Sequence, residues 1–315
     1  MSLLYGGGLY HGGGLYVGLD TIAFGKIYVF GTSGKILSIN DSNQVTTVVS
    51  PTTSNYIDAW FSSSLIGYAV TTNGKVVKTT NGGASWDLVS TITSPFDIRS
   101  IYAIDDNTVV VGGKSAATGS MIWRSTDGGV NWSTAYSIAD TQPIECFSFI
   151  NTLTGFCVDI NRLIMTTDGG ASWSLVSATP TFSDEISMVD AFNGWIGRES
   201  AGGSAYKTTG AAGGFSNVVT SGDTLGVDAL SLTRAHMCGS AGYVYKTTNG
   251  TTWTANQIST PTDYLTCIHF SRENLAKGVV CGSENSIFIT TNSGTTWTQI
   301  TGITGYFNSA FIRNS

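Results

Sequence analysis

The chain has 315 residues and a formal net charge of −6, and 11% of its residues are charged, against about 25% in average globular domains. Serine and threonine together supply 80 residues and glycine 39, a composition that favours strands and tight turns over helices. Proteins that bind nucleic acids carry positive charge that neutralises the phosphates, whereas this chain has a net negative charge. We therefore expect an all-β protein without a nucleic-acid partner.

Membrane insertion and export are also not expected. The sequence has no apolar run of 18 residues, so it predicts no transmembrane helix, and residues 1–20 lack the basic start and unbroken apolar middle of a secretory signal.

The cysteines are odd in number, widely spaced and without a CxxC pair: Cys146, Cys157, Cys238, Cys267 and Cys281. We expect reduced, core-packed thiols in a protein made inside a cell, with no metal site and no cofactor.

A turn motif recurs along the chain with the pattern (S/T)-(S/T)-(D/N)-G-G-x-(S/T/N)-W. Its aromatic anchors are separated by 46, 41, 42, 38 and 44 residues and are Trp86, Trp132, Trp173, Phe215, Trp253 and Trp297. The copy before Phe215 has lost its Asp/Asn, and the copy before Trp253 is one residue short. A period of 40–45 residues with several strands in each unit predicts the blades of a β-propeller.

Each repeat divides into four short strands, A to D, and the motif forms the turn between C and D. In one copy these strands are predicted over 57–62, 66–71, 75–80 and 86–89. The first polar residue of each turn can accept hydrogen bonds from backbone N–H groups of its own turn, and these residues are Asn81, Asp127, Asp168, Asn249 and Asn292. The glycines allow left-handed backbone, and the tryptophan that opens strand D fills the space between sheets.

These copies resemble Asp-box repeats, also called BNR repeats. That motif occurs in the propellers of sialidases, sortilin-type receptors, photosystem II assembly factors, some glycanases and phage structural proteins. The resemblance covers residues 79–297 and implies a propeller in which the boxes have a folding role. It does not select one function, because unrelated activities share the box.

The number of inner strands predicts seven blades. Strand A begins near each of Ile57, Ile98, Ile144, Ile186, Val227, Leu265 and Phe307. The last of these, residues 306–312, has no further strands behind it, and residues 26–30, 35–39 and 45–49 supply three strands without an A. We expect the C-terminal strand to complete the N-terminal blade and close the ring, which removes free sheet edges. Residues 21–315 would then form one domain, preceded by an arm over residues 1–20.

The inner strands suggest a polar ring in the central channel. Alignment on the first apolar residue of each strand places next the residues Asp58, Arg99, Glu145, Ser187, Asp228, Thr266 and Asn308. Three carboxylates against one arginine would hold a cation or a basic side chain of a partner. The alternative is a hydrated channel whose polar groups are satisfied by water and by neighbouring strands.

The arm repeats a Leu-Tyr pair between glycine triplets, as Leu4-Tyr5, Leu9-Tyr10 and Leu15-Tyr16. Glycine triplets are costly to order, so the pairs need a surface to pack on. We expect an anchor for a partner protein; packing on the chain's own propeller is the alternative. Short Gly-rich openings of this kind also resemble those of some phage structural proteins.

Catalysis is not expected. The sequence has no Arg-Ile-Pro, and its seven arginines are spread about one to a blade, unlike the clustered arginines of a sialidase. A glycosidase pair drawn from Asp58, Glu145 and Asp228 is the alternative. His236, Cys238, Cys267 and His269 suggest a zinc site, but the repeat aligns the cysteines with small core positions.

These observations predict a non-catalytic interaction propeller within a larger assembly. We expect a phage virion protein of the tail, fibre or capsid decoration, made in the host cytoplasm. Its protein partners would bind through the arm and the face that carries the D–A and B–C loops. One alternative is a carbohydrate-binding or glycoside-processing propeller, with a glycan as ligand. A second is an assembly chaperone that resembles the photosystem II factors.

Overall fold

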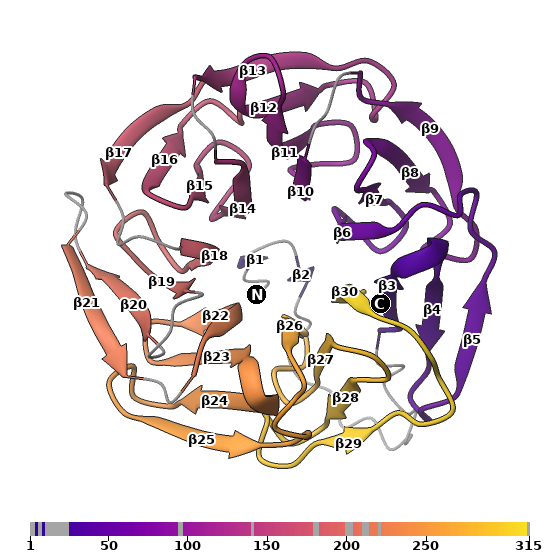
Figure 1. Cartoon of the computed structure of the whole chain (residues 1–315). Coiled ribbons are helices and arrows are strands. Elements are labelled where there is room, and N and C mark those ends of the chain that lie inside the picture. Colours follow the sequence, from indigo (N-terminus) through magenta and orange to yellow (C-terminus); the bar gives the residue numbers. More distant parts are fainter. Residues whose placement is uncertain are drawn as a thin grey trace.

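A computed structural model describes residues 4–5, 8–9, 25–93, 97–139, 142–178, 183–198, 204–209, 214–219 and 222–313. Seven four-stranded antiparallel sheets stand around a central axis (Figure 1). Helical structure in these residues is confined to two 3-10 turns, η1 (Thr32–Gly34) and η2 (Ser240–Gly242), and neither could cross a membrane. The expected all-β, seven-bladed fold is confirmed.

Each blade runs outward from strand A at the axis to strand D at the rim. The strands of the first three blades are β30 (Phe307–Ile312), β3 (Ile27–Gly31), β4 (Ile36–Ile39) and β5 (Val45–Val48); β6 (Tyr56–Phe61), β7 (Gly67–Thr71), β8 (Lys75–Thr79) and β9 (Asp87–Thr91); and β10 (Asp97–Ala103), β11 (Val109–Ser115), β12 (Gly119–Ser125) and β13 (Ser133–Ile138). The fourth and fifth blades contain β14 (Ile144–Phe149), β15 (Gly155–Asp159), β16 (Arg162–Thr166) and β17 (Ser174–Ala178); and β18 (Ser183–Met188), β19 (Asn193–Arg198), β20 (Ser204–Thr209) and β21 (Gly214–Val219). The sixth and seventh contain β22 (Thr224–Ser231), β23 (Arg234–Gly239), β24 (Tyr243–Thr247) and β25 (Trp253–Gln257); and β26 (Leu265–Phe270), β27 (Gly278–Gly282), β28 (Ile287–Thr290) and β29 (Thr298–Gln299).

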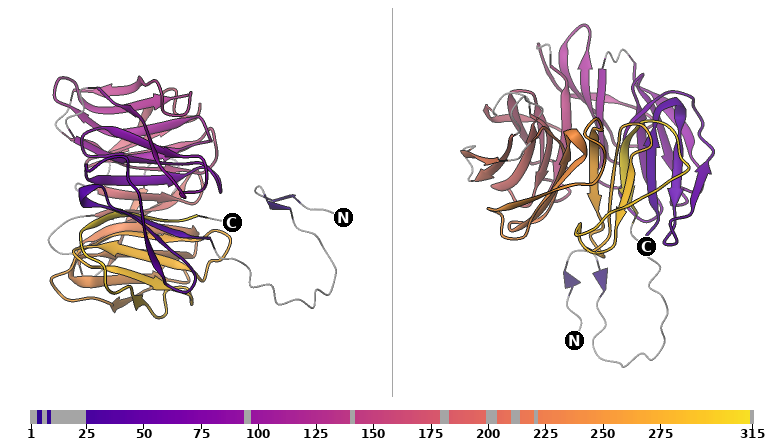
Figure 2. Two further views of the ribbon diagram at one scale, coloured as in Figure 1. Left: turned by 90° about the vertical axis from the view of Figure 1, so that its right-hand side faces the viewer. Right: turned by 60° about the horizontal axis from the view of Figure 1, so that its bottom comes forward.

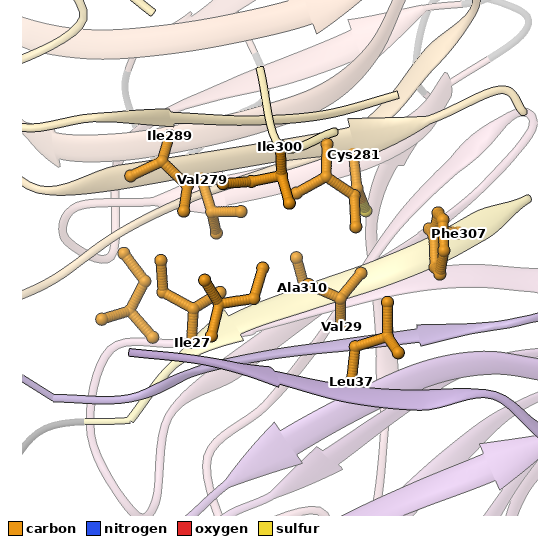
Figure 3. Close-up of a cluster of buried hydrophobic side chains, with 12 residues drawn as sticks. Ile27, Val29, Leu37, Val279, Cys281, Ile289, Ile300, Phe307 and Ala310 are labelled. Atoms are coloured by element: carbon orange, nitrogen blue, oxygen red, sulfur yellow. The ribbon is translucent and has the colours of Figure 1, made fainter. Parts of the chain in front are cut away.

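The C-terminal strand closes the ring as predicted. β30 pairs antiparallel with β3, with Ile27 opposite Ile312 and Val29 opposite Ala310. Figure 3 shows the seam that results: side chains of β3, β4 and β30 face side chains of blade seven across a buried apolar layer. Phe307 is fully buried in that layer. A buried side chain of this size contributes about 1.5–3 kcal/mol, so the two chain ends are held by packing as well as by pairing.

Five of the motif turns, those that keep the Asp or Asn, are built on a common hydrogen-bonding pattern. In the first, Asn81 Oδ1 accepts from the Ser85 N–H at 2.9 Å, and Thr79 Oγ1 accepts from the Gly83 N–H at 2.8 Å. The same two bonds occur around Asp127, Asp168 and Asn292. Around Asn249, where the turn is one residue short, the corresponding bonds span three residues instead of four. Backbone and side-chain donors lower the pKa of Asp127 and of Asp168 to about 2. The tryptophans lie just before strand D, except Trp253, which begins β25.

The two faces of the ring differ. The D–A and B–C loops emerge on one face, here called the D–A face, and the A–B and C–D turns emerge on the other, the A–B face. Both described ends of the propeller lie on the A–B face, where the Arg313 N–H donates to the Lys26 carbonyl at 2.9 Å. Figure 2 shows the ring from its side.

Candidate functional site: the central channel and its mouth

The seven inner strands enclose a cavity of about 470 Å³ to which every blade contributes. In each inner strand the pairing with strand B skips one residue near the D–A face. The skipped residues are Asn308, Ile57, Arg99, Glu145, Asp184, Leu225 and Thr266. A bulge re-aims a side chain, and its repetition in all seven blades defines the ring at the mouth of the channel.

The structure corrects the polar ring expected from the sequence. Arg99, Glu145 and Asn308 lie in the mouth ring, together with Thr266. Asp58 is one residue deeper, because Ile57 occupies the bulge of β6. Asp228, like Ser187, lies three residues deeper than the bulge of its strand. Alignment on the first apolar residue fails because Ile57 is itself the bulged residue of β6, whereas Ile186 and Val227 each lie two residues past the bulge of their strand.

The mouth is acidic on the side of blades three to five. Arg99 Nη2 donates to Asp97 Oδ2 at 3.0 Å, and Arg99 Nε lies 3.8 Å from Glu145 Oε2. Lys114 Nζ lies 3.9 Å from Asp97. Burial raises the pKa of Glu145 to about 7; Arg99 opposes this shift and Asp184 adds to it. Asp97 and Asp159 also raise the pKa of Glu145, so the carboxylates around it disfavour its ionised form.

Two more carboxyl groups line the cavity one residue below the mouth. Cys146 Sγ donates to Glu185 Oε1 at 2.7 Å, and burial raises the pKa of Glu185 well above its ordinary value. Burial also raises the pKa of Asp58 to about 6, although three donors oppose the shift. The part of the channel next to the D–A face thus contains carboxyl groups whose negative charge is poorly compensated by neighbouring donors and cations.

Side chains of one inner strand bind the backbone of the next. Asp58 Oδ2 accepts from the Ile101 N–H at 3.0 Å, and Asp228 Oδ2 accepts from the Phe270 N–H at 2.6 Å. The equivalent acceptors in other blades are Ser309, Ser148, Ser187 and His269. Asp58, Ser187 and Asp228 of the sequence-derived ring therefore bind blades to each other. Thr266 and Asn308 do so as well, because they donate to the Phe307 and Tyr56 carbonyls of the next blade.

The other end of the channel contains an ion pair and a belt of aromatic rings. Arg272, from the A–B turn of blade seven, places Nη2 2.5 Å from Asp228 Oδ1. Beside this pair, rings contact one another around the axis in the order Phe149, Tyr102, Trp60, Phe311 and His269. Burial raises the pKa of Tyr102 to about 12 and lowers that of His269 to about 4. This end is therefore largely apolar.

Sequence reasoning missed several residues of the mouth. Asp184 and Glu185 begin an inner strand, but the alignment passed over them to Ser187. Tyr264 and Tyr306 precede β26 and β30 and are half exposed on the D–A face. The acidic pair could have been found by allowing a bulge in each strand.

The remaining predictions for this region have different outcomes. His236 stacks on Phe270 at 3.9 Å, and Cys238 Sγ donates to the Leu265 carbonyl, so both pack as core residues. In the arm, β1 (Leu4–Tyr5) pairs with β2 (Gly8–Leu9). Tyr10, Leu15 and Tyr16 lie outside the described residues, and partner binding by the arm stays a prediction.

Comparison with known proteins supports the fold. No family model matches the chain, and no curated protein matches it in sequence. YCF48 from Cyanidioschyzon merolae superposes with a TM-score of 0.66 at 15% identity, over 89% of this chain and 98% of that chain. YCF48 bound to a D1 peptide gives 0.62 at 16% identity, over 79% and 83%. A GH74 xyloglucanase from Xanthomonas campestris gives 0.62 at 14%, over 92% and 53%.

At these sequence identities the likeness shows the fold alone. The chain is therefore a seven-bladed β-propeller, an architecture that serves both a peptide-bound protein and a glycoside hydrolase among its structural neighbours.

Proposed function

We propose that this chain is a non-catalytic, peptide-binding propeller that takes a basic segment of a partner protein at the mouth of its channel. The observation that carries the proposal is the composition of that mouth. Asp58, Glu145 and Glu185 line a 470 Å³ cavity, and Tyr264 and Tyr306 are half exposed just before β26 and β30 on the same face of the ring. Tyrosines supply apolar contact area to a bound segment, and carboxylates supply charge complementarity.

A lysine or arginine side chain is the complementary ligand for this cavity. Burial disfavours ionisation of Asp58, Glu145 and Glu185, because neighbouring cations do not fully compensate them. An incoming cation would favour the ionised carboxylates and would in turn be held by them. Affinity for a basic peptide should therefore rise between pH 5 and pH 8, as Asp58 and Glu145 ionise.

The same geometry argues against catalysis. Asp58 accepts three hydrogen bonds and Asp228 is paired with Arg272, so neither is free for acid–base work on a substrate. We expect no hydrolysis of sialosides, β-glycosides or xyloglucan by the purified chain. Turnover that is lost in Glu145→Gln would favour the glycoside-processing alternative.

The setting of this activity is also part of the proposal. YCF48, which shares the fold at low identity, has been seen bound to a D1 peptide. That precedent favours the assembly-chaperone alternative over the virion protein expected from the arm.

We further assign the repeated motif turns to the Asp-box type, because their shared hydrogen bonds stabilise the turn itself. These turns lie on the A–B face, so we assign peptide binding to the D–A face.

The test is selection of a random 12-residue peptide library against the immobilised full chain, followed by calorimetry on synthetic winners. We expect winners with lysine or arginine beside apolar residues. Glu145→Lys should weaken their binding at least tenfold. Asp87→Lys, at an exposed position of the rim strand β9, makes the same charge reversal away from the mouth; it is the matched control and should change binding less than twofold. Winners without basic residues, or equal binding to both variants, would refute the proposal.

A further inference from the structure

The A–B face carries a circle of exposed apolar side chains. Four of them come from A–B turns of different blades: Leu65 is 56% exposed, Leu153 59%, Phe192 50% and Leu232 43%. In blade three, Val130 of the motif turn is 54% exposed on the same face. Five consecutive blades, from the second to the sixth, therefore each present one large apolar residue. Single exposed leucines are ordinary, but this repetition at equivalent turns is not explained by chance exposure.

Folding does not require these side chains. The Leu65 carbonyl accepts from the Gly82 N–H at 2.8 Å, and the Leu153 carbonyl accepts from the Gly169 N–H at 2.9 Å, which ties each A–B turn to the motif turn of its blade. In blade three Asn107 accepts the same bond from Gly128 at 2.9 Å. A polar residue thus serves the turn equally well, because only the backbone is used.

The arm joins the ring on this same face. The Gly25 carbonyl accepts from Lys277 Nζ at 3.0 Å, in the A–B turn of blade seven. On the other side of the entry point, Arg313 Nη1 donates to the Ser64 carbonyl at 2.9 Å, beside Leu65. The arm therefore joins the ring between the A–B turns of blades seven and two, on the face that carries the exposed apolar side chains.

We infer that the Leu-Tyr arm of each chain docks on the A–B face of its own propeller, with its pairs seated against these turn residues. The apolar residues recur from blade to blade, and Leu-Tyr pairs recur along the arm: β1 and β2 place Leu4 opposite Leu9, and Leu15-Tyr16 follows after a further glycine triplet. At about 3.3 Å per residue, the segment from Tyr16 to Gly25 reaches about 30 Å and that from Leu4 to Gly25 about 70 Å. Covalent attachment gives the arm a high effective concentration there. This inference is independent of the peptide site, which lies on the other face.

The arm's position is tested by photocrosslinking in the full chain. Tyr10 is replaced by p-benzoylphenylalanine, the protein is mixed with an equal amount of ¹⁵N-labelled wild-type chain and irradiated, and the crosslinked peptides are identified by mass spectrometry. We expect crosslinks within one chain to peptides that contain Leu65, Val130, Leu153, Phe192 or Leu232. Crosslinks between light and heavy chains, crosslinks to the D–A face or the rim, or no crosslink would overturn the inference.

Surface variants give the matched control. The triple variant Leu65→Ser, Leu153→Ser and Phe192→Ser should reduce crosslinking at least fivefold. The pair Leu88→Ser and Leu175→Ser, exposed residues of the rim strands β9 and β17, should leave it within a factor of 1.5. If the triple variant does not fold, Asn107→Leu adds an apolar residue to blade three and should create a new crosslink at that turn. An unchanged crosslinking pattern in that variant would contradict docking of the arm on this face.

Discussion

Asp58 and Ile101 are 43 residues apart and belong to neighbouring blades, yet Asp58 Oδ2 accepts the Ile101 N–H at 3.0 Å. Ile101 lies on an inner strand, whose open edge faces the channel, so its N–H has no strand partner on that side. Asp58 also accepts from Ser309 Oγ at 3.0 Å and so connects blades one, two and three. One side chain thereby satisfies groups that the propeller geometry would leave unpaired.

Replacement of that carboxylate should loosen the ring. We expect Asp58→Ala to lower the free energy of unfolding by about 1–3 kcal/mol, because it leaves the buried Ile101 N–H unsatisfied. Asp87→Ala, at an exposed position in β9, is the control and should change it by less than about 0.5 kcal/mol. Urea denaturation of both variants measures the difference, and equal losses would contradict the bridging role.

Closure of the ring can be tested with two adjacent residues. Phe307 is fully buried in the seam between blades one and seven, whereas Tyr306 is 54% exposed. Phe307→Ala should cost about 3–5 kcal/mol and Tyr306→Ala less than about 1 kcal/mol. Thermal unfolding in the same buffer compares them. A mild effect at Phe307 would mean that the seam contributes little to the fold.

The motif turns make a prediction about glycine. Gly83 and Gly302 both have positive φ, at 84° and 77°, so alanine is strained at either position. A Cβ at Gly83 would lie 2.4 Å from the ring of Tyr28, whereas one at Gly302 meets nothing within 4 Å. We expect Gly302→Ala to cost about 1–2 kcal/mol and Gly83→Ala about 1–3 kcal/mol more, measured by urea denaturation. Similar losses would show that backbone strain alone sets the cost.

Ionisation of Glu145 should make stability depend on pH. The folded-state pKa of about 7 lies above the ordinary value of 4.5, so this group's contribution to stability falls as pH rises through that interval. Glu145→Gln stays neutral and should be more stable than wild type above pH 7, by on the order of 3 kcal/mol, with little difference at pH 4. Glu284→Gln makes the same change on an exposed turn. A difference from wild type that does not vary with pH would disprove this ionisation.

The sequence by itself determined the architecture. The motif recurs because each blade needs the same turn, and a repeat of about 42 residues leaves room for four strands, so the blade count and the closure by residues 306–312 followed from spacing. The sequence also predicted part of the mouth ring: Arg99 and Glu145 lie where the alignment placed them. Local chemistry was enough in these cases, because turn bonds and strand alternation depend on neighbours in the chain.

Only the tertiary structure decided what the channel residues do. A bulge shifts register by one residue without a mark in the sequence, so Asp58 and Asp228 were aligned with the mouth although they lie below it and bind the next blade. Arg272 meets Asp228 from a turn 44 residues away, and Cys146 donates to Glu185 of the next blade only because the two blades pack side by side. These relationships depend on how blades pack around the axis, and that packing brings together residues that no spacing connects.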